Sequence, residues 1–137
     1  MIKSRHLVSI AVASCLAVGL WAPVLAQTRT ASQFYTTYRV AFDKATTIDE
    51  LLPLMSKKTN DQVAETPVAE RGKAFELIKM MGAVTDVKIL KEAKTADGAT
   101  LTVEALDSDK KKTTGTVKVV KEGGAWKLDS ESWSSSS

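Results

Sequence analysis

The chain has 137 residues, of which 44% are hydrophobic and 26% are charged. This composition excludes a disordered chain, and the length leaves room for one globular domain. Without Lys3 and Arg5, which lie in a segment that we expect to be removed, 17 of the 19 basic residues remain against 16 acidic ones, a charge of +1. So small a charge does not favour nucleic acid or an anionic membrane as a partner.

The first 26 residues have the pattern of a secretory signal peptide. Lys3 and Arg5 form a basic head, residues 7–20 form an apolar run, and Val24-Leu25-Ala26 supplies the small residues that precede a cleavage site. The apolar run is shorter than the roughly 20 residues of a spanning helix, so we expect no stable membrane span after cleavage. We expect cleavage after Ala26 and export to the periplasm or the outside of a bacterial cell.

Cleavage after Ala26 would remove the only histidine, His6, and the only cysteine, Cys15. The mature chain would then lack cysteine and histidine nucleophiles, histidine bases, Cys/His zinc ligands and disulfides. We therefore expect a protein without catalytic residues, cofactor or metal. A lipoprotein cleaved before Cys15 is the less favoured alternative, because the apolar residues 16–25 would follow the lipidated cysteine.

The first predicted helix runs from an N-cap at Ser32 to about Ala45, after a short flexible lead over residues 27–31. Apolar side chains recur along it at helical spacing. Its aromatic residues are Phe34, Tyr35, Tyr38 and Phe42. We expect Phe34, Tyr38 and Phe42 to form a ridge around which a sheet wraps.

Two further helices are predicted before the sheet. A capping box of Thr47 and Glu50 begins a short or kinked helix over Ile48–Met55, which Pro53 limits. Residues 56–60 read as a polar connector. The third helix begins at Thr66-Pro67 and ends at Gly82, where a glycine commonly adopts a left-handed conformation. Its expected buried face comprises Val68, Phe75, Ile78 and either Leu77 or Met81.

Residues 84–133 predict four strands. Alternating apolar positions are separated by turn signals at Asp97-Gly98, in the charged segment 107–112 and at Gly123-Gly124. Such short connections require antiparallel neighbours. The predicted fold is α+β, with three N-terminal helices packed on one face of a curved four-stranded antiparallel meander, a single domain over residues 32–133 and a flexible tail over 134–137.

The last strand carries two tryptophans, Trp126 and Trp133, an odd number of residues apart. In a regular strand they face opposite sides of the sheet unless a bulge intervenes. Trp126 shares the helix-facing side with Leu128. If Trp133 is exposed, it is the candidate residue for binding a partner; if it is covered, it is an ordinary packing residue.

The aromatic first helix, the short segment Thr-Ile-Asp-Glu-Leu-Leu-Pro-Leu-Met-Ser and the terminal Gly-Gly-Ala-Trp-Lys-Leu strand resemble the nuclear transport factor 2-like superfamily, a cystatin-like α+β group, and its small exported bacterial members of unknown function. The resemblance covers about residues 32–133 and implies a curved sheet that leaves a conical pocket against the first helix. The expected pocket residues are Phe34, Tyr38, Phe42, Phe75 and Trp126. Residues 57–66 are too polar and short for the strand hairpin that larger members insert there.

Three functions fit these features. The first is an exported, non-catalytic binding or accessory domain that holds a small apolar ligand between the first helix and the sheet. The second is a protein-interaction module, an inhibitor or envelope-assembly factor, that binds an envelope protein or forms a homodimer through the sheet. The third, implied by the resemblance, is an isomerase or dehydratase that uses Tyr35 or Tyr38 with one carboxylate among Asp43, Glu104 and Glu131.

Overall fold

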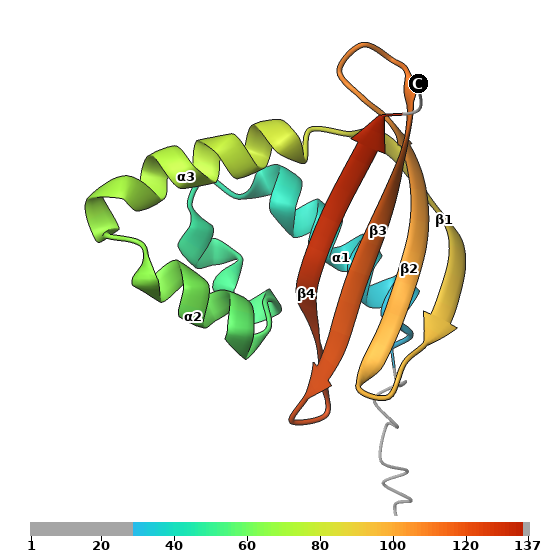
Figure 1. The fold of residues 1–137 in the computed structure, drawn as a ribbon, viewed down its shortest axis with the longest axis horizontal. Helices are drawn as coiled ribbons and strands as arrows, with labels where there is room; N and C mark the ends of the chain where they lie inside the picture. Colours follow the sequence, from blue (N-terminus) through green and yellow to red (C-terminus); the bar gives the residue numbers. More distant parts are fainter. Residues whose placement is uncertain (1–28, 136–137) are drawn as a thin grey trace, which may run out of the picture.

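The computed structural model describes residues 29–135. The predicted signal peptide, its cleavage site at Ala26, and Cys15 lie outside these residues. Figure 1 shows helices that precede a curved four-stranded sheet, so the predicted α+β class with an antiparallel meander is confirmed. No helix within the described residues is long and apolar enough to cross a membrane.

Helix α1 (Ala31–Lys44) lies against three strands of the sheet, β1 (Thr85–Lys94), β2 (Gly98–Leu106) and β4 (Ala125–Ser135). Its N-cap is Thr30 rather than the predicted Ser32. The Thr30 hydroxyl accepts a hydrogen bond from the Gln33 backbone N–H at 3.1 Å, and the Thr30 backbone N–H donates to Gln33 Oε1 at 2.9 Å. Ser32 instead bonds Glu92 of β1, at 2.8 Å from its amide. The first helix therefore begins at Ala31, within the predicted flexible lead.

The segment between α1 and the sheet contains more helix than the sequence pattern indicates. The predicted second helix is two 3₁₀ turns, η1 (Ile48–Glu50) and η2 (Leu52–Leu54), as expected where Pro53 removes a donor. The predicted polar connector is the start of helix α2 (Lys57–Glu65), whose N-cap is Ser56. Helix α2 contacts β4, and its lack of an apolar stripe explains why the sequence pattern did not predict it.

Helix α3 (Val68–Met81) ends before Gly82 as predicted, but its N-cap is Pro67 rather than Thr66, and its buried face is not the predicted one. Phe75 is buried, whereas Val68, Leu77, Ile78 and Met81 are exposed. The helix contacts η1 and extends past the β4 edge of the sheet (Figure 1). Gly82 follows it with φ of −96°, not in the left-handed region; a Cβ there would lie 2.8 Å from the Phe42 ring.

The sheet has the order β1 (Thr85–Lys94), β2 (Gly98–Leu106), β3 (Lys112–Glu122) and β4 (Ala125–Ser135), each strand antiparallel to its neighbours. Gly123 and Gly124 form the β3–β4 turn with φ of 58° and 80°, a conformation that glycine adopts without steric cost. Strand β4 continues to Ser135, into the predicted tail.

The core lies between α1 and the inner face of the sheet. The aromatic ridge is buried as predicted: Phe34, Tyr38 and Phe42 are each at most 5% exposed. The side chains that meet it from the sheet are Ala99, Leu101, Val103, Val117, Val119 and Leu128. The Tyr38 and Phe42 rings lie 6.0 Å apart, so the ridge is continuous along α1.

A bulge in β4 changes which side chains reach this core. Lys118 pairs with Ser130 and Val119 with Leu128, which leaves Asp129 as an extra residue. An extra residue reverses the alternation of every side chain that follows it. Glu131 and Trp133 consequently face α1.

Candidate functional site

Four side chains form a polar cluster between α1 and β4, which we call the Glu131 cluster. The Tyr35 hydroxyl donates to Glu131 Oε2 at 2.8 Å, Arg39 Nη1 donates to Glu131 Oε1 at 3.0 Å, and Trp133 Nε1 donates to the same oxygen at 3.0 Å. The Arg39 and Glu131 side chains are 7% and 10% exposed. Both carboxylate oxygens therefore accept from protein donors in a site with little access to water.

The rest of the Arg39 guanidinium is held from three sides. Nη2 donates to the Gly82 carbonyl oxygen at 2.9 Å and to Asp43 at 3.3 Å. The guanidinium carbon lies 4.6 Å from the centre of the Phe42 ring, a cation–π distance. Arg39 is thus fixed in place by groups from α1, β4 and the end of α3.

The two tyrosines of α1 titrate abnormally. Burial raises the pKa of Tyr35 well above its usual value, and the negative charge of Glu131 raises it further. Burial also raises the pKa of Tyr38. Both hydroxyls remain protonated at any physiological pH.

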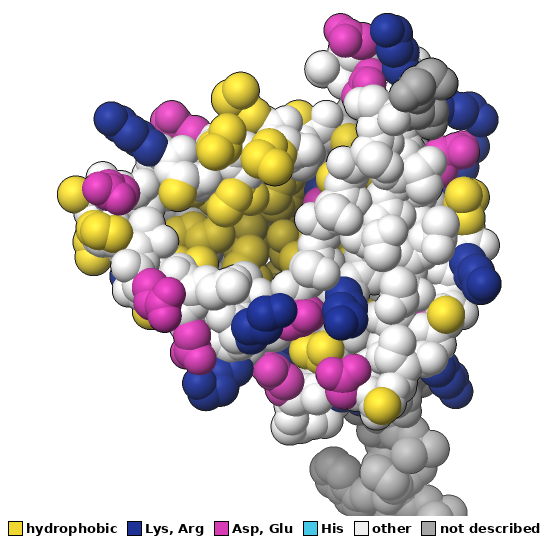
Figure 2. Space-filling model, viewed as in Figure 1, with side chains coloured by type: hydrophobic (Ala, Val, Ile, Leu, Met, Phe, Trp, Pro, Cys, Tyr) yellow, Lys and Arg dark blue, Asp and Glu magenta, His cyan; other side chains and the backbone are white. Residues whose placement is uncertain are grey.

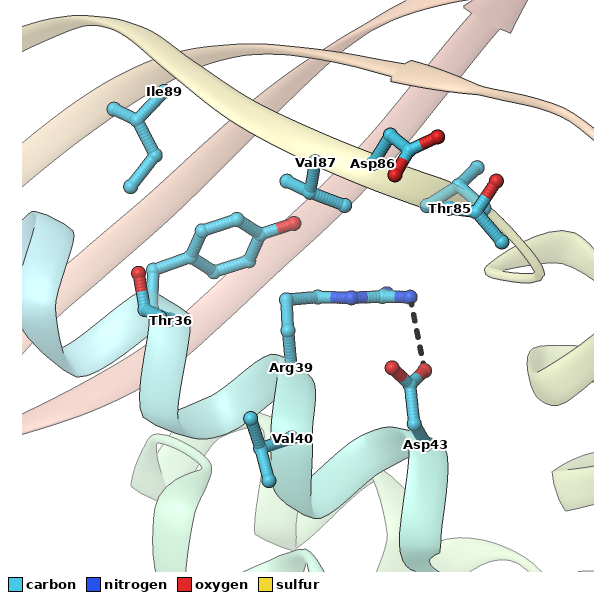
Figure 3. A pocket seen from close by; sticks show the side chains of 10 residues that line it. Thr36, Arg39, Val40, Asp43, Thr85, Asp86, Val87 and Ile89 are labelled. Atoms are coloured by element: carbon cyan, nitrogen blue, oxygen red, sulfur yellow. Dashed lines mark hydrogen bonds and ion pairs between the residues drawn. The ribbon is translucent and has the colours of Figure 1, made fainter.

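A cleft between α1 and β1, which we call the α1–β1 cleft, lies beside this cluster and has a volume of about 440 Å³. Figure 3 shows Arg39 and Val40 on α1, with Val87 and Ile89 opposite them on β1. Tyr35 of α1 also lines the cleft. The remaining lining residues are Thr36, Asp43, Val84, Thr85 and Asp86. The cleft therefore combines an apolar wall with a polar end.

Asp86 shapes the β1 side of this cleft. Its φ of 54° is in the left-handed region, which aspartate tolerates better than most residues, and the β1–β2 register shifts between Thr85 and Lys88. Figure 3 shows Asp86 and Thr85 on the strand above Arg39 and Asp43. The bulge thus brings a second carboxylate to the polar end of the cleft.

A second hollow, the α2–α3 groove, has a volume of about 230 Å³. Its apolar lining comprises Ile48, Val63, Ala74, Phe75 and Ile78. Figure 2 shows hydrophobic side chains on the floor of the hollow between α2 and α3 and over α3 itself. A third hollow, of about 490 Å³, is lined by β1, β2 and β3 side chains that include Asp86, Lys88, Glu104 and Lys112.

The predicted pocket residues do not converge on one hollow. Phe34, Tyr38 and Phe42 belong to the core and line none of these three, and Phe75 lines the α2–α3 groove. Trp126 is half-buried against the core, as predicted for the helix-facing side, and its indole N–H donates to the Arg29 carbonyl oxygen. The aromatic ridge is part of the core between α1 and the sheet.

Trp133 is half-buried and packs against the core. Its pairing with Gly115 and its bond to Glu131 place it on the helix-facing side, so the regular-strand orientation predicted for it is wrong. The reason is the Asp129 bulge. Trp133 is therefore a packing residue rather than an exposed one.

The enzyme alternative named three candidate carboxylates to act with a tyrosine. Of these, only Glu131 contacts a tyrosine, Tyr35. Asp43 contacts Arg39, and Glu104 forms an ion pair with Lys112 at 3.4 Å. Arg39 is not among the site residues predicted from the sequence. Its signal was spacing: Arg39 follows Tyr35 by four residues and precedes Phe42 by three, so it lies on the same apolar helix face. A cation on such a face requires a buried partner.

Within the part of the chain that the structure describes, no three or more Asp, Glu, His or Cys side chains group as metal ligands would.

Comparison with known families finds that residues 42–129, more than half of the chain, match the family described as Domain of unknown function (DUF4878). No curated protein and no solved structure matches the chain.

Proposed function

Because the chain belongs to the DUF4878 family, whose domain has no known function, its role has to be argued from its own site, and we propose that it is an exported, non-catalytic domain that binds a small apolar ligand in the α1–β1 cleft. We further propose that the fold is of the nuclear transport factor 2-like kind, with the ligand between the first helix and the sheet but outside the filled core.

The α1–β1 cleft is the observation that carries this proposal. Its volume of about 440 Å³ falls in the range of small-molecule sites, and its wall of Val40, Val84, Val87 and Ile89 offers apolar surface. The polar groups of the Glu131 cluster lie at one side of it, where a few fixed polar atoms would orient a ligand.

The Glu131 cluster supports the non-catalytic part of the proposal. A general base needs a lone pair directed at substrate. Glu131 does not line the α1–β1 cleft, and three of the roughly four lone-pair sites of its carboxylate already accept hydrogen bonds from Tyr35, Arg39 and Trp133. Tyr35 donates its hydroxyl hydrogen to Glu131 and so has none to give to an oxyanion. These groups are better suited to hold the cleft wall than to react.

The signal-peptide pattern of residues 1–26 supports the export part of the proposal. It places the site in the periplasm or outside the cell, where a domain without disulfides must be stabilised by its core.

A fluorescence titration tests the binding proposal. The probe is N-phenyl-1-naphthylamine, which is uncharged and brightens in apolar surroundings, added to protein purified after expression of the full chain. Val40→Trp places a large side chain at an exposed helix position that lines the cleft, and Ala74→Trp does the same at the α2–α3 groove.

We expect the wild type and Ala74→Trp to bind the probe and Val40→Trp to bind it at least tenfold more weakly, because the added indole fills the cleft. Loss of binding in Ala74→Trp alone would place the ligand in the groove instead. No fluorescence increase with the wild type would contradict a small apolar ligand altogether.

One observation favours the protein-interaction alternative: helix α3 exposes apolar side chains. Trp133, the candidate from the sequence, is not among them. Leu77, Met80 and Met81 recur at helical spacing and are 56%, 74% and 70% exposed. Such an apolar stripe could pair with the same stripe of a second copy. Sedimentation velocity of the wild type and of Leu77→Lys/Met80→Lys tests this: a dimer present only in the wild type supports it, and monomers in both exclude it.

A further inference from the structure

Arg39 has a donor that the protein does not use. Its Nε–H is buried and has no hydrogen-bond partner among the described residues, although Nη1 and Nη2 are bonded to Glu131, Asp43 and Gly82. Buried polar groups without partners are rare in native proteins, and each requires an explanation. The Arg39 side chain is only 7% exposed, yet it lines the α1–β1 cleft (Figure 3).

The surroundings of Arg39 keep this donor in place. Glu131 holds one end of the guanidinium, the Gly82 carbonyl oxygen holds the other, and the Phe42 ring lies against its face. A fixed donor loses little conformational entropy when it bonds a ligand. An oxygen atom that reaches Nε would therefore complete the hydrogen bonding of a group already in position.

The charges around the cleft select the kind of oxygen. Asp43 and Asp86 line the cleft, and Glu131 lies behind Arg39. The cations are Arg39 itself and Lys79, whose ammonium donates to the Asp43 carbonyl oxygen at 3.2 Å. Three carboxylates against two cations disfavour an anionic ligand, whereas an uncharged oxygen meets no such repulsion.

We propose that the α1–β1 cleft binds an uncharged ligand whose apolar body lies against the Val40, Val84, Val87 and Ile89 wall and whose carbonyl oxygen accepts a hydrogen bond from Arg39 Nε. This inference rests on the proposed function, because it names the ligand class of the same site. It gives Arg39 a binding role in addition to its pairing with Glu131.

Two matched fluorescent probes test the ligand class. The first is 6-propionyl-2-(dimethylamino)naphthalene, which is uncharged and carries one ketone; the second is 6-propyl-2-(dimethylamino)naphthalene, which lacks the ketone oxygen. Dissociation constants of both are measured with the wild type. The infrared carbonyl stretch of the bound ketone is recorded as well, since a hydrogen bond from a charged donor lowers its frequency.

We expect the ketone to bind roughly tenfold or more tightly than the probe without oxygen, as for a hydrogen bond to a charged group. We expect its bound carbonyl stretch to lie below that in an aprotic solvent. Equal affinities, or an unshifted stretch, would overturn the inference. A probe in which a carboxylate replaces the ketone should bind more weakly than the ketone, and tighter binding would overturn the charge argument.

The variant Arg39→Met/Glu131→Gln removes Nε and the carboxylate together, so that no unpaired charge is left buried. If circular dichroism shows it folded, the preference for the ketone should fall to nearly equal affinities, and a retained preference would assign the bond to another donor. If it does not fold, the infrared measurement on the wild type decides.

The two proposals fail in different ways. If both probes bind equally and Val40→Trp weakens both, the cleft holds an apolar ligand but Arg39 does not recognise its oxygen. If neither probe binds, or if Val40→Trp has no effect, the proposed function itself is wrong.

Discussion

Tyr35 and Glu131, 96 residues apart, are joined by a 2.8 Å hydrogen bond that ties α1 to β4. Tyr35 is completely buried, and the side chain of its acceptor is 10% exposed. The bond therefore lies where water cannot replace it. It connects the first element of the domain to the last, across the core.

Replacing Tyr35 with phenylalanine should destabilise the fold without changing its shape. The substitution removes the hydroxyl and leaves Glu131 Oε2 without this donor, at a cost of about 2 kcal/mol for a bond to a charged group. Urea unfolding followed by circular dichroism measures the loss in free energy of unfolding.

Tyr38→Phe is the matched control for Tyr35→Phe. Tyr38 lies one turn further along α1, is equally buried, and its hydroxyl makes no hydrogen bond to any residue in the range 29–135. We expect a change below about 0.5 kcal/mol, as for substitutions away from a bonded network. Equal losses in the two variants would show that the bond to Glu131 adds no stability.

The domain should also lose stability at alkaline pH through its tyrosines. Tyr35 and Tyr38 are the only two in the sequence, and burial raises the pKa of both above the ordinary 10. Above that pH the unfolded chain releases protons that the folded chain keeps. The contribution of the two protonated tyrosines to the free energy of unfolding is therefore fully present below pH 10. Above pH 10 it decreases by about 1.4 kcal/mol per pH unit for each tyrosine, until the folded chain also releases its protons.

Ultraviolet absorbance measures this directly, because tyrosinate has its own absorption band. We expect tyrosinate to appear together with the loss of the folded circular dichroism signal, and near pH 10 when the protein is first unfolded in urea. Tyrosinate formation near pH 10 in a protein that remains folded would show that the two hydroxyls are accessible.

Export predicts a defined N-terminus. When the full chain is expressed in a bacterium, the intact mass of the exported protein should correspond to a start at Gln27, since Ala26 is the last residue of the predicted cleavage site. Ala26→Leu should block cleavage and leave the larger precursor. A product that begins at a lipid-modified Cys15 would instead establish the lipoprotein alternative.

The sheet could be predicted from the sequence because its signals are local. Alternation and the turns at Asp97-Gly98 and Gly123-Gly124 fix strand order without knowledge of the helices. The Asp129 bulge has no such signal. The Asp129 side chain accepts a hydrogen bond from the Ser56 hydroxyl at 2.9 Å, and the Ser56 amide donates to the Leu128 carbonyl oxygen at 2.8 Å. Because Ser56 is the N-cap of α2, the bulge depends on contacts with the start of that helix.

The candidate site was harder to predict for the same reason. Tyr35 and Glu131 were both named from the sequence, but only the bulge shows that Glu131 faces the helix, and Arg39 joins them through contacts distant in the chain. The cleft depends on the left-handed Asp86, which no turn motif marks. The helical spacing of the α1 aromatic residues correctly indicated a buried ridge, whereas the pocket expected beside them came from the resemblance alone.

Gly115 is the residue that makes room for Trp133. The two are cross-strand partners on β3 and β4, and a Cβ on Gly115 would lie 2.8 Å from both the Trp133 ring and a Val103 methyl group. Contacts this short require a neighbour to move. The absence of a Cβ on Gly115 therefore leaves room for the Trp133 ring where its Nε1 donates to Glu131.

Gly115→Ala should accordingly cost about 2 kcal/mol of unfolding free energy, as overpacked substitutions do, and should change the near-ultraviolet circular dichroism of the tryptophans. Trp133→Leu in the same chain should recover part of that loss, since it removes one of the two contacts. Gly72→Ala is the control: its Cβ would meet nothing within 4 Å on α3, and alanine favours a helix by up to about 1 kcal/mol. If Gly115→Ala is as stable as the wild type, Trp133 is not confined by β3.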